Sequence, residues 1–363
     1  MLAAAHPDPA GRRGSARALL ATAGACALAS ALALACLWAR REPLRAEWAR
    51  TIGVDSTVQG LHQWRRRARP PGVVGAVLFG DSLTICTWEA QMPPLVERGL
   101  ARRSVRTAFV SAVHLAFRPI NFYYLVNEVR GGAPRVAIVE VNLRMFSEHV
   151  LVRPEWRFVQ LARMLSLPQA WRLRAVLAGE GVTQLDPPLY RLEDRLGLLY
   201  AADGLRLTAA DALERVGGRL GDAVGLARRD PYWHVARATE AIQTLDVRTA
   251  RAEYGVRQAD HPMAAALGAL GEELRAGGAA VVFYVSPVNV DHLAEIGVRE
   301  ELALGERVEA LRRAVGATPE EWVDLHAAVP AEGFRDLQNH MRPLGCEIAA
   351  DRVSEAVARA VGS

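Results

Sequence analysis

The chain has 363 residues, of which 51% are hydrophobic and 23% are charged, and its formal net charge is +4. This composition is typical of a globular protein and excludes a disordered, collagen-like or multi-span membrane chain. Every basic residue is Arg, because the sequence contains no Lys. A Walker phosphate loop, a pyridoxal phosphate Schiff base and a Ser-x-x-Lys acylase each need a Lys, so these three classes are excluded.

The four Cys and nine His form no Cys-x-x-Cys pair and no His-Glu-x-x-His motif. We therefore expect neither a metal nor another cofactor.

Arg clusters occur at residues 65–67, 102–103 and 228–229, but no nucleic-acid-binding motif accompanies them, so we expect no nucleic-acid partner. We interpret Cys86 and Cys346 as two buried free thiols, although an exported compartment would permit a disulfide between them.

The N-terminal region contains a run of uncharged residues, 19–38, and about 20 apolar residues can cross a bilayer as a helix. We predict an uncleaved membrane anchor after a cytoplasmic N-terminus of residues 1–18, with the remainder outside the cytoplasm. The alternatives are a signal peptide cleaved at the Ala-x-Ala site of residues 33–35, a lipoprotein at Cys36, and a buried soluble helix. Arginines flank both sides of the run, so the positive-inside rule gives no orientation.

Residues 39–72 are expected to form a juxtamembrane linker that ends in a Pro-Pro-Gly break. Trp64 stands beside three arginines, which would suit lipid headgroups, but a solvated linker is the simpler interpretation.

Residues 73–363 alternate short apolar runs with helical patterns, which is typical of an α/β domain with a mainly parallel sheet and three α/β/α layers. Residues 146–255 show helical patterns, for example at 156–165 and 209–226, and predict a helical insertion between the third and fourth strands. This insertion either caps the site or is a packing or membrane-facing appendage. The strands are expected at 73–79, 105–110, 135–141, 279–285 and 322–325, and the helices at 119–129, 262–275, 299–315 and 346–361.

The motif Gly80-Asp81-Ser82 follows the first predicted strand directly. Gly80 permits a tight turn, and Ser82 would open the next helix at the carboxyl edge of the sheet, where open α/β folds bind ligands. We predict that Ser82 is a nucleophile, with a helix N-cap as the alternative, and that Asp81 supports the turn.

A second motif, from Asp336 to His340, lies in a predicted loop before the last helix. A serine hydroxyl becomes a good nucleophile only when a base removes its proton, and His340 is the candidate base. Asp336 would orient the imidazole and stabilise its charged form. The alternative for His340 is a surface loop residue. We expect the other histidines of interest to be structural or solvated: His114, His292 and His326.

Together these residues resemble the SGNH/GDSL hydrolase superfamily over residues 73–142 and 278–363. The resemblance implies a three-layer fold and ester cleavage or acyl transfer through an acyl-enzyme, with Ser82 as the nucleophile and His340 as the base. The family spaces its acid and base as Asp-x-x-His, whereas three residues separate Asp336 from His340 here. Asp324 is a substitute acid.

The family's oxyanion donors are the backbone of the nucleophile, here Ser82, a Gly after the second strand and an Asn after the third. Asn142 matches the Asn, or simply closes the strand, and residues 109–114 contain no Gly. The anchor, the missing Gly and the sequence of residues 286–289 resemble the membrane-associated branch, which includes the D-alanine transfer protein of teichoic acid synthesis and the alginate acetylation proteins. This branch implies an envelope polysaccharide, a lipid or an acylated small substrate, and a membrane acyltransferase as partner.

Two classes of function therefore remain at the level of the sequence. One is an active esterase or O-acyltransferase, and the other is a non-catalytic polymer-binding or scaffold protein on the same fold. The pairing of Ser82 with His340 favours the enzyme, because a binding protein needs neither residue. The missing Gly and the altered Asp-to-His spacing favour the binding protein.

Overall fold

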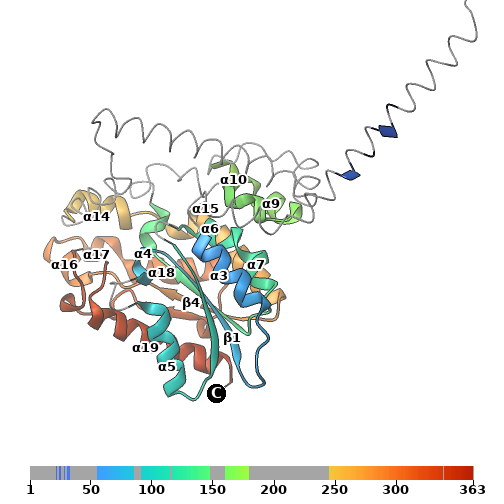
Figure 1. Cartoon of the computed structure of the whole chain (residues 1–363). Helices are drawn as coiled ribbons and strands as arrows, with labels where there is room; N and C mark the ends of the chain where they lie inside the picture. The colour runs from blue at the N-terminus through green and yellow to red at the C-terminus, as the bar shows by residue number, and fades with distance from the viewer. Residues whose placement is uncertain are drawn as a thin grey trace, which may run out of the picture.

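The structure is a computed structural model of the chain, shown in Figure 1. It describes residues 55–85, 91–114, 117–147, 160–179, 245–337 and 339–362, together with six residues between Thr22 and Leu32.

Five parallel strands form one sheet in the order β2-β1-β3-β4-β5. Each strand is joined to its neighbour in parallel register, for example Phe79 to Val139 and Glu140 to Tyr284. The predicted α/β class with a parallel sheet is confirmed, and every predicted strand is present, although β2 lies two to three residues further along the chain than expected. The strands are β1 (Val74–Gly80), β2 (Thr107–Val113), β3 (Val136–Val141), β4 (Ala280–Val285) and β5 (Trp322–Asp324).

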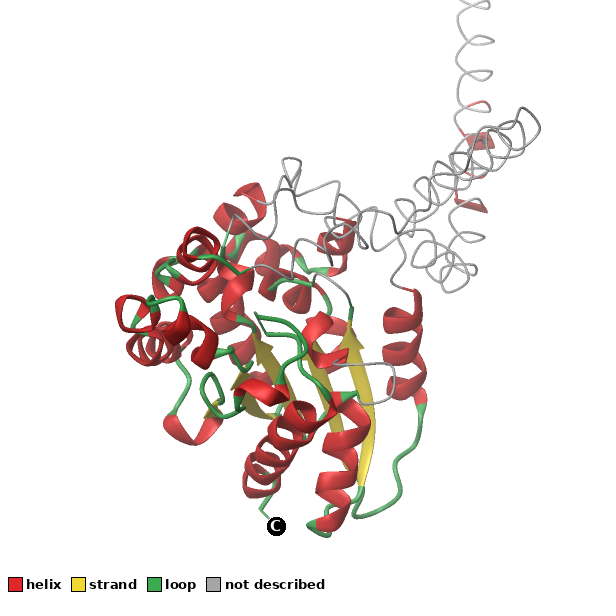
Figure 2. Cartoon of the chain, turned by 90° about the vertical axis from the view of Figure 1, so that its left-hand side faces the viewer, coloured by secondary structure: helices red, strands yellow, loops and turns green. Residues whose placement is uncertain are grey.

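Helices cover both faces of the sheet, which gives three layers (Figure 2). On one face, α5 (Met92–Arg102) and α19 (Pro343–Ala360) bury strand residues such as Leu78 and Ile138. On the other face, strand residues such as Phe79 and Val139 pack under a larger group of helices. That group contains α3 (Asp55–Arg66), α6 (Pro119–Tyr124), α7 (Val126–Arg130), α15 (Pro262–Ala276) and α18 (Leu304–Val315).

Two predicted helices are each divided in two. The stretch expected at 119–129 forms α6 and α7, which meet at Leu125. The stretch expected at 299–315 forms α17 (Arg299–Leu302) and α18, separated by Ala303 in a left-handed conformation with φ of 45°. A left-handed residue cannot continue a right-handed helix, so the helix axis breaks there.

Several short elements connect the main layers. α4 (Ser82–Ile85) follows β1, and α16 (Val290–Glu295) follows β4. Five 3-10 turns complete the described connections: η1 (Leu143–Phe146), η2 (Gln160–Met164), η3 (Gln258–Asp260), η4 (Pro319–Glu321) and η5 (Ala331–Gly333).

The described parts of residues 146–255 are helical, as predicted for the insertion between β3 and β4. The predicted helix at 209–226 lies outside the described residues, and the one at 156–165 is described only from residue 160 onward, as η2. The α-helices of this region are α9 (Leu167–Arg172), α10 (Arg174–Gly179) and α14 (Val247–Tyr254).

The predicted anchor at residues 19–38 lies outside the described residues except at a few positions. Two of these, Leu28 and Leu32, are helical and exposed. In the part of the chain that the structure describes, no helix combines the length and the apolar character that a bilayer crossing requires.

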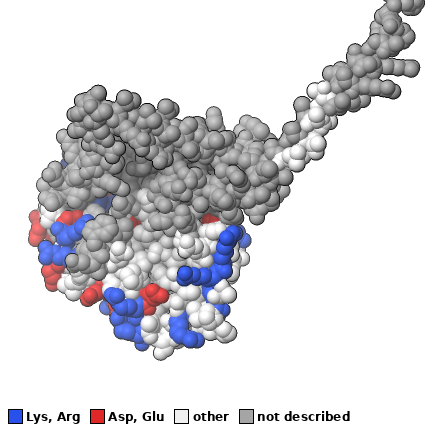
Figure 3. Space-filling model, viewed as in Figure 1, with Lys and Arg blue, Asp and Glu red and all other residues white. Residues whose placement is uncertain are grey.

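The predicted linker at 39–72 is wrong for residues 55–66, which form α3 and belong to the core. Val58, Leu61 and Trp64 recur every three residues and are all buried. The Trp64 indole N–H donates to the carbonyl of Ala108 in β2 at 2.8 Å, so this side chain does not face a membrane. Of the arginines that follow Trp64, Arg66 and Arg67 are exposed, whereas Arg65 is half-buried and pairs with Glu128 at 3.5 Å. The face of the molecule drawn in Figure 3 carries both basic and acidic side chains.

We predict that Trp64→Ala destabilises the protein by about 3–5 kcal/mol, the usual cost of removing a large buried aromatic side chain. The free energy of unfolding, measured in urea on the full-length chain, checks this. The matched control is Arg67→Ala, which removes an exposed side chain from the same segment and should change stability by less than about 0.5 kcal/mol. Equal stability of the two variants would show that α3 is a surface appendage.

Candidate active site

The sheet order places a crevice at the carboxyl ends of β1 and β3. The chain passes from β1 to β2 on one side and crosses to β3 on the other, so the direction of winding reverses between β1 and β3. Ligands of doubly wound sheets bind at such a reversal point. Ser82 directly follows the turn after β1, and Asn142 follows β3, so two predicted site residues lie at this crevice.

The turn before Ser82 is tightly packed. The buried Asp81 carboxylate accepts the backbone N–H of Leu83 through Oδ1 at 2.8 Å, which supports the turn as expected. A Cβ atom on Gly80 would lie 2.0 Å from Thr84 Oγ1 and 2.9 Å from Glu140 Oε2, so only Gly fits there. Ser82 itself is half-buried, and its hydroxyl makes no hydrogen bond to a described residue.

The candidate base, His340, and its predicted partner, Asp336, are in direct contact. Nδ1 of His340 lies 2.5 Å from Oδ2 of Asp336. The other oxygen, Oδ1, accepts the backbone N–H groups of Asn339 at 3.0 Å and His340 at 3.1 Å, which curls the loop around the carboxylate. The three-residue spacing therefore still joins acid to base. A neutral His340 that donates its Nδ1 proton to Asp336 leaves Nε2 free to accept a proton.

The Asn142 side chain connects the two halves of the site. Its Nδ2 donates to Oδ2 of Asp81 at 2.8 Å, and its Oδ1 accepts from Nδ2 of Asn339 at 3.5 Å and from the Arg144 backbone at 3.1 Å. Asp81 and Asn339 are the residues that precede Ser82 and His340. Asn142 therefore links the turn before Ser82 to the loop that holds Asp336 and His340. Its second Nδ2 hydrogen makes no hydrogen bond to a described residue.

A buried carboxyl group that the sequence analysis missed lies directly beneath the turn. Glu140 Oε2 accepts the Asp81 backbone N–H and the Thr84 hydroxyl, both at 2.6 Å. Ser286 donates its hydroxyl to Oε1 at 2.7 Å, and the Tyr284 hydroxyl is 3.1 Å from Thr84 Oγ1. Glu140 therefore joins the ends of three neighbouring strands. A single Glu in the otherwise apolar strand of residues 136–141 was the available signal, because buried charge is costly.

Burial determines the charge of this cluster. Burial and, after it, the nearby Asp81 charge raise the pKa of Glu140 to about 8, although hydrogen bonds from Thr84, the Asp81 backbone and Ser286 oppose the rise. Burial also raises the pKa of Asp81, which is opposed by hydrogen bonds with Leu83, Asn142 and Glu140 and by the charge of His340. Two carboxyl groups in one dry site cannot both ionise cheaply, so Glu140 holds a proton at neutral pH.

An ion pair holds the loop of residues 336–340, named the base loop here after its candidate base His340. Arg144, buried after β3, donates from Nη1 to Oδ1 of Asn339 at 3.0 Å. Its Nε lies 2.9 Å from Oε2 of Glu253, which is buried on α14. The loop that holds His340 is therefore tied both to β3 and to the helical region between β3 and β4.

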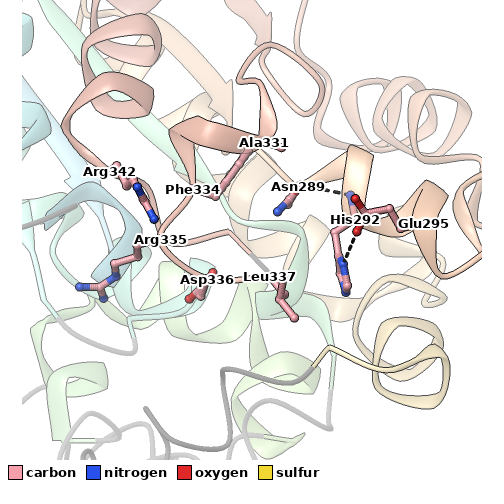
Figure 4. Close-up of a pocket in the computed structure, with 9 residues that line it drawn as sticks. All are labelled: Asn289, His292, Glu295, Ala331, Phe334, Arg335, Asp336, Leu337 and Arg342. Carbon is pink, nitrogen blue, oxygen red and sulfur yellow. Dashed lines mark hydrogen bonds and ion pairs between the residues drawn. The ribbon is translucent and has the colours of Figure 1, made fainter.

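A pocket of about 510 Å³ opens beside this loop (Figure 4). Asp336 and Leu337 lie near its middle, with Arg335 and Arg342 on one side and His292 on the other. This volume falls within the range of about 300–1,000 Å³ that is usual for small-molecule sites.

The remaining candidates contact other residues than the acid–base pair. Asp324, the substitute acid, contacts His326 instead, with Oδ1 of Asp324 2.7 Å from Nδ1 of that residue. His292 lies 3.0 Å from the carbonyl of Leu245 through Nε2. His114 stacks on Phe117 with 5.0 Å between ring centroids. No group of three or more His, Cys, Asp or Glu side chains is placed to hold a metal among the residues described.

The interpretation of Cys346 as a free thiol is wrong, because Cys346 is disulfide-bonded. Its partner is one of Cys26, Cys36 and Cys86, all of which lie outside the described residues. Cys346 is fully buried in the first turn of α19, directly after the base loop. The sequence allowed both states, since the redox compartment that decides between them is not written in the spacing of cysteines.

No protein-family model matches the chain, and a search of the curated proteins found no similar one.

We predict that Cys346→Ser lowers the free energy of unfolding by about 2–4 kcal/mol under oxidising conditions, because the cross-link restricts the unfolded chain. Urea denaturation with and without dithiothreitol measures this, and the reductant should affect only the parent protein. A parent protein whose four cysteines all react with a thiol reagent after denaturation without reductant would contradict the disulfide.

Proposed function

We propose that this protein is a serine-dependent esterase or O-acyltransferase. The observation that carries the proposal is the 2.5 Å contact between His340 and Asp336, on a loop that Asn142 links to the residue before Ser82. A half-buried serine at the reversal point of a parallel sheet and an imidazole oriented by a carboxylate on a linked loop are the components that nucleophilic acyl transfer needs. The resemblance of the two motifs to the SGNH/GDSL superfamily supports the same reaction.

The mechanism follows from these positions. Ser82 Oγ attacks the carbonyl carbon of the acyl donor while His340 Nε2 takes the hydroxyl proton, and Asp336 stabilises the imidazolium that forms. The free Nδ2 hydrogen of Asn142 and the backbone N–H of Ser82 are the proposed oxyanion donors. His340 then returns its proton to the departing alcohol, which leaves the acyl group on Ser82. Water or a sugar hydroxyl takes that acyl group in the second half of the reaction.

Ser82 makes no hydrogen bond to a described residue, and this is compatible with the mechanism. Catalytic hydrogen bonds in the absence of substrate are often long and tighten in the complex. The hydrogen bonds of Asn142 to Asp81 and Asn339 already link the residues that precede Ser82 and His340.

We propose an acylated carbohydrate or lipid of the cell envelope as the substrate, with a membrane acyltransferase as partner. A buried disulfide at Cys346 supports an oxidising compartment outside the cytoplasm. The uncharged run at 19–38, in which Leu28 and Leu32 are exposed, supports a membrane anchor. The pocket beside Asp336 is the proposed entrance for substrate.

We predict that Ser82→Ala and His340→Ala each lower kcat/KM for p-nitrophenyl acetate by about 10⁴- to 10⁶-fold, and Asp336→Asn by about 10⁴-fold. The assay uses the full-length chain in detergent. The matched control is Asp324→Asn, which alters the other His–Asp contact and should keep the parent rate.

Each outcome of this assay decides something. Full activity in Ser82→Ala would exclude Ser82 as the nucleophile. A parent protein without activity toward the small ester would be treated with a fluorophosphonate, and labelling at Ser82 would identify a selective transferase. No labelling would favour a non-catalytic polymer-binding protein.

A further inference from the structure

Glu140 reaches the backbone that carries the nucleophile without contacting the reacting atoms. Its Oε2 accepts the N–H of Asp81 at 2.6 Å, one residue before Ser82, and the hydroxyl of Thr84 at 2.6 Å, two residues after it. The same carboxyl group therefore holds both ends of the turn. Gly80 has no side chain at the point where a Cβ would come within 2.9 Å of Oε2, so the backbone can approach this closely.

The hydrogen-bond pattern shows where a proton on Glu140 would lie. Oε2 must accept, because the backbone N–H of Asp81 can only donate. Oε1 faces the Ser286 hydroxyl at 2.7 Å, and a hydroxyl can accept as readily as it donates. A protonated Glu140 can therefore keep both hydrogen bonds that Oε2 accepts and carry its proton on Oε1, where it would donate to the Ser286 oxygen and reverse the direction of that one bond.

The charged and titratable groups around Glu140 come from every element that packs against it. Asp81 follows β1, Tyr284 lies on β4, and His340 lies on the base loop, close enough to act on Asp81. Asp81 is occupied by Leu83 and Asn142, and Tyr284 stays neutral because burial raises its pKa well above the usual value. No described cation pairs with the Glu140 carboxyl.

We propose that Glu140, in its neutral form, is a positioning residue for the nucleophile, and that loss of its proton disables the site. This inference rests on the proposed function of Ser82. An ionised Glu140 puts a second negative charge beside Asp81 at a position where both side chains are buried, and the two carboxylates repel each other. Asp81 holds Leu83 and Asn142, so any separation of the pair moves Ser82 and the Asn142 oxyanion donor. The added charge also opposes the negative charge that develops on the substrate.

Glu140→Gln tests the proposal because glutamine reproduces the neutral pattern. Its Nε2 can donate to Ser286 and its Oε1 can accept from Asp81 and Thr84, without a group that ionises.

We expect kcat of the parent protein to fall about 30-fold between pH 7 and pH 9.5, as a group with a pKa of about 8 loses its proton. Glu140→Gln should keep most of its pH 7 kcat at pH 9.5, with KM little affected. Glu140→Ala should lose at least about 100-fold in kcat at both pH values. The control Glu347→Gln changes an exposed carboxyl on α19 and should retain the parent profile.

Stability supplies a second readout that does not need activity. The folded pKa of Glu140 lies above the ordinary value of 4.5, so the folded protein binds the proton more tightly than the unfolded chain. Stability from this group is therefore complete below about pH 4.5 and decreases by up to about 1.4 kcal/mol per pH unit as the pH rises to about 8. Urea unfolding between pH 5 and pH 9 should show that decrease in the parent and a flatter profile in Glu140→Gln.

The two readouts separate the possible failures. Equal stability profiles for the parent and Glu140→Gln would show that Glu140 is not protonated in the folded protein and would overturn the proposal. The same alkaline loss of kcat in both proteins would also overturn it. An inactive, unlabelled parent protein whose stability profile flattens in Glu140→Gln would refute the proposed function, and with it the catalytic part of this inference, while leaving the buried proton established.

Discussion

The buried carboxyl of Glu140 is the constraint on which the site depends. A parallel sheet covered on both faces ordinarily buries only aliphatic and aromatic side chains, and an unpaired carboxylate there costs many kcal/mol. The chain reduces this cost because burial raises the pKa of Glu140 to about 8 and because the group has hydrogen-bond partners in the turn after β1, in α4 and after β4. Gly80, Asp81 and Thr84 are thereby fixed in position around Ser82. The conformation of this turn is the one in which the Asp81 N–H and the Thr84 hydroxyl can both donate to the Glu140 carboxyl group.

The strands and the main helices could be predicted from the sequence because their signals are local. The apolar runs that became β1, β3 and β4 are bounded by Gly, Pro or polar residues, and their limits were found to within one or two residues. α3 was missed because its position after an arginine-flanked apolar run suggested a linker. Its apolar residues at 58, 61 and 64 were a weak signal over only three turns. The burial of these residues against β2 depends on residues far away in the sequence and cannot be predicted from the segment itself.

Only those residues of the candidate site that belong to sequence motifs could be predicted. Ser82, Asp336, His340 and Asn142 carry motifs, and the structure places them at one edge of the sheet. Their supporting partners, such as Glu140, Arg144 and Asn339, carry no motif, because each acts through contacts between residues more than fifty positions apart. The contact of Asp336 with His340 shows the limit of spacing rules. An additional residue in the loop is absorbed when the carboxylate accepts two backbone N–H groups of that loop.

The ion pair between Arg144 and Glu253 raises a question of energetics. Buried ion pairs rarely stabilise a protein more than apolar residues of the same volume would, because both charges lose their water. Such a pair does, however, fix the orientation of its partners, and here Arg144 also donates to Asn339, the residue before His340. A leucine at this position could fill the space but could not hold the Asn339 amide toward Asn142. The buried pair therefore contributes to orientation. Arg144 can reach Glu253 and Asn339 together only when α14, the end of β3 and the loop of residues 336–340 lie in one arrangement, and in that arrangement Asn339 also donates to Asn142.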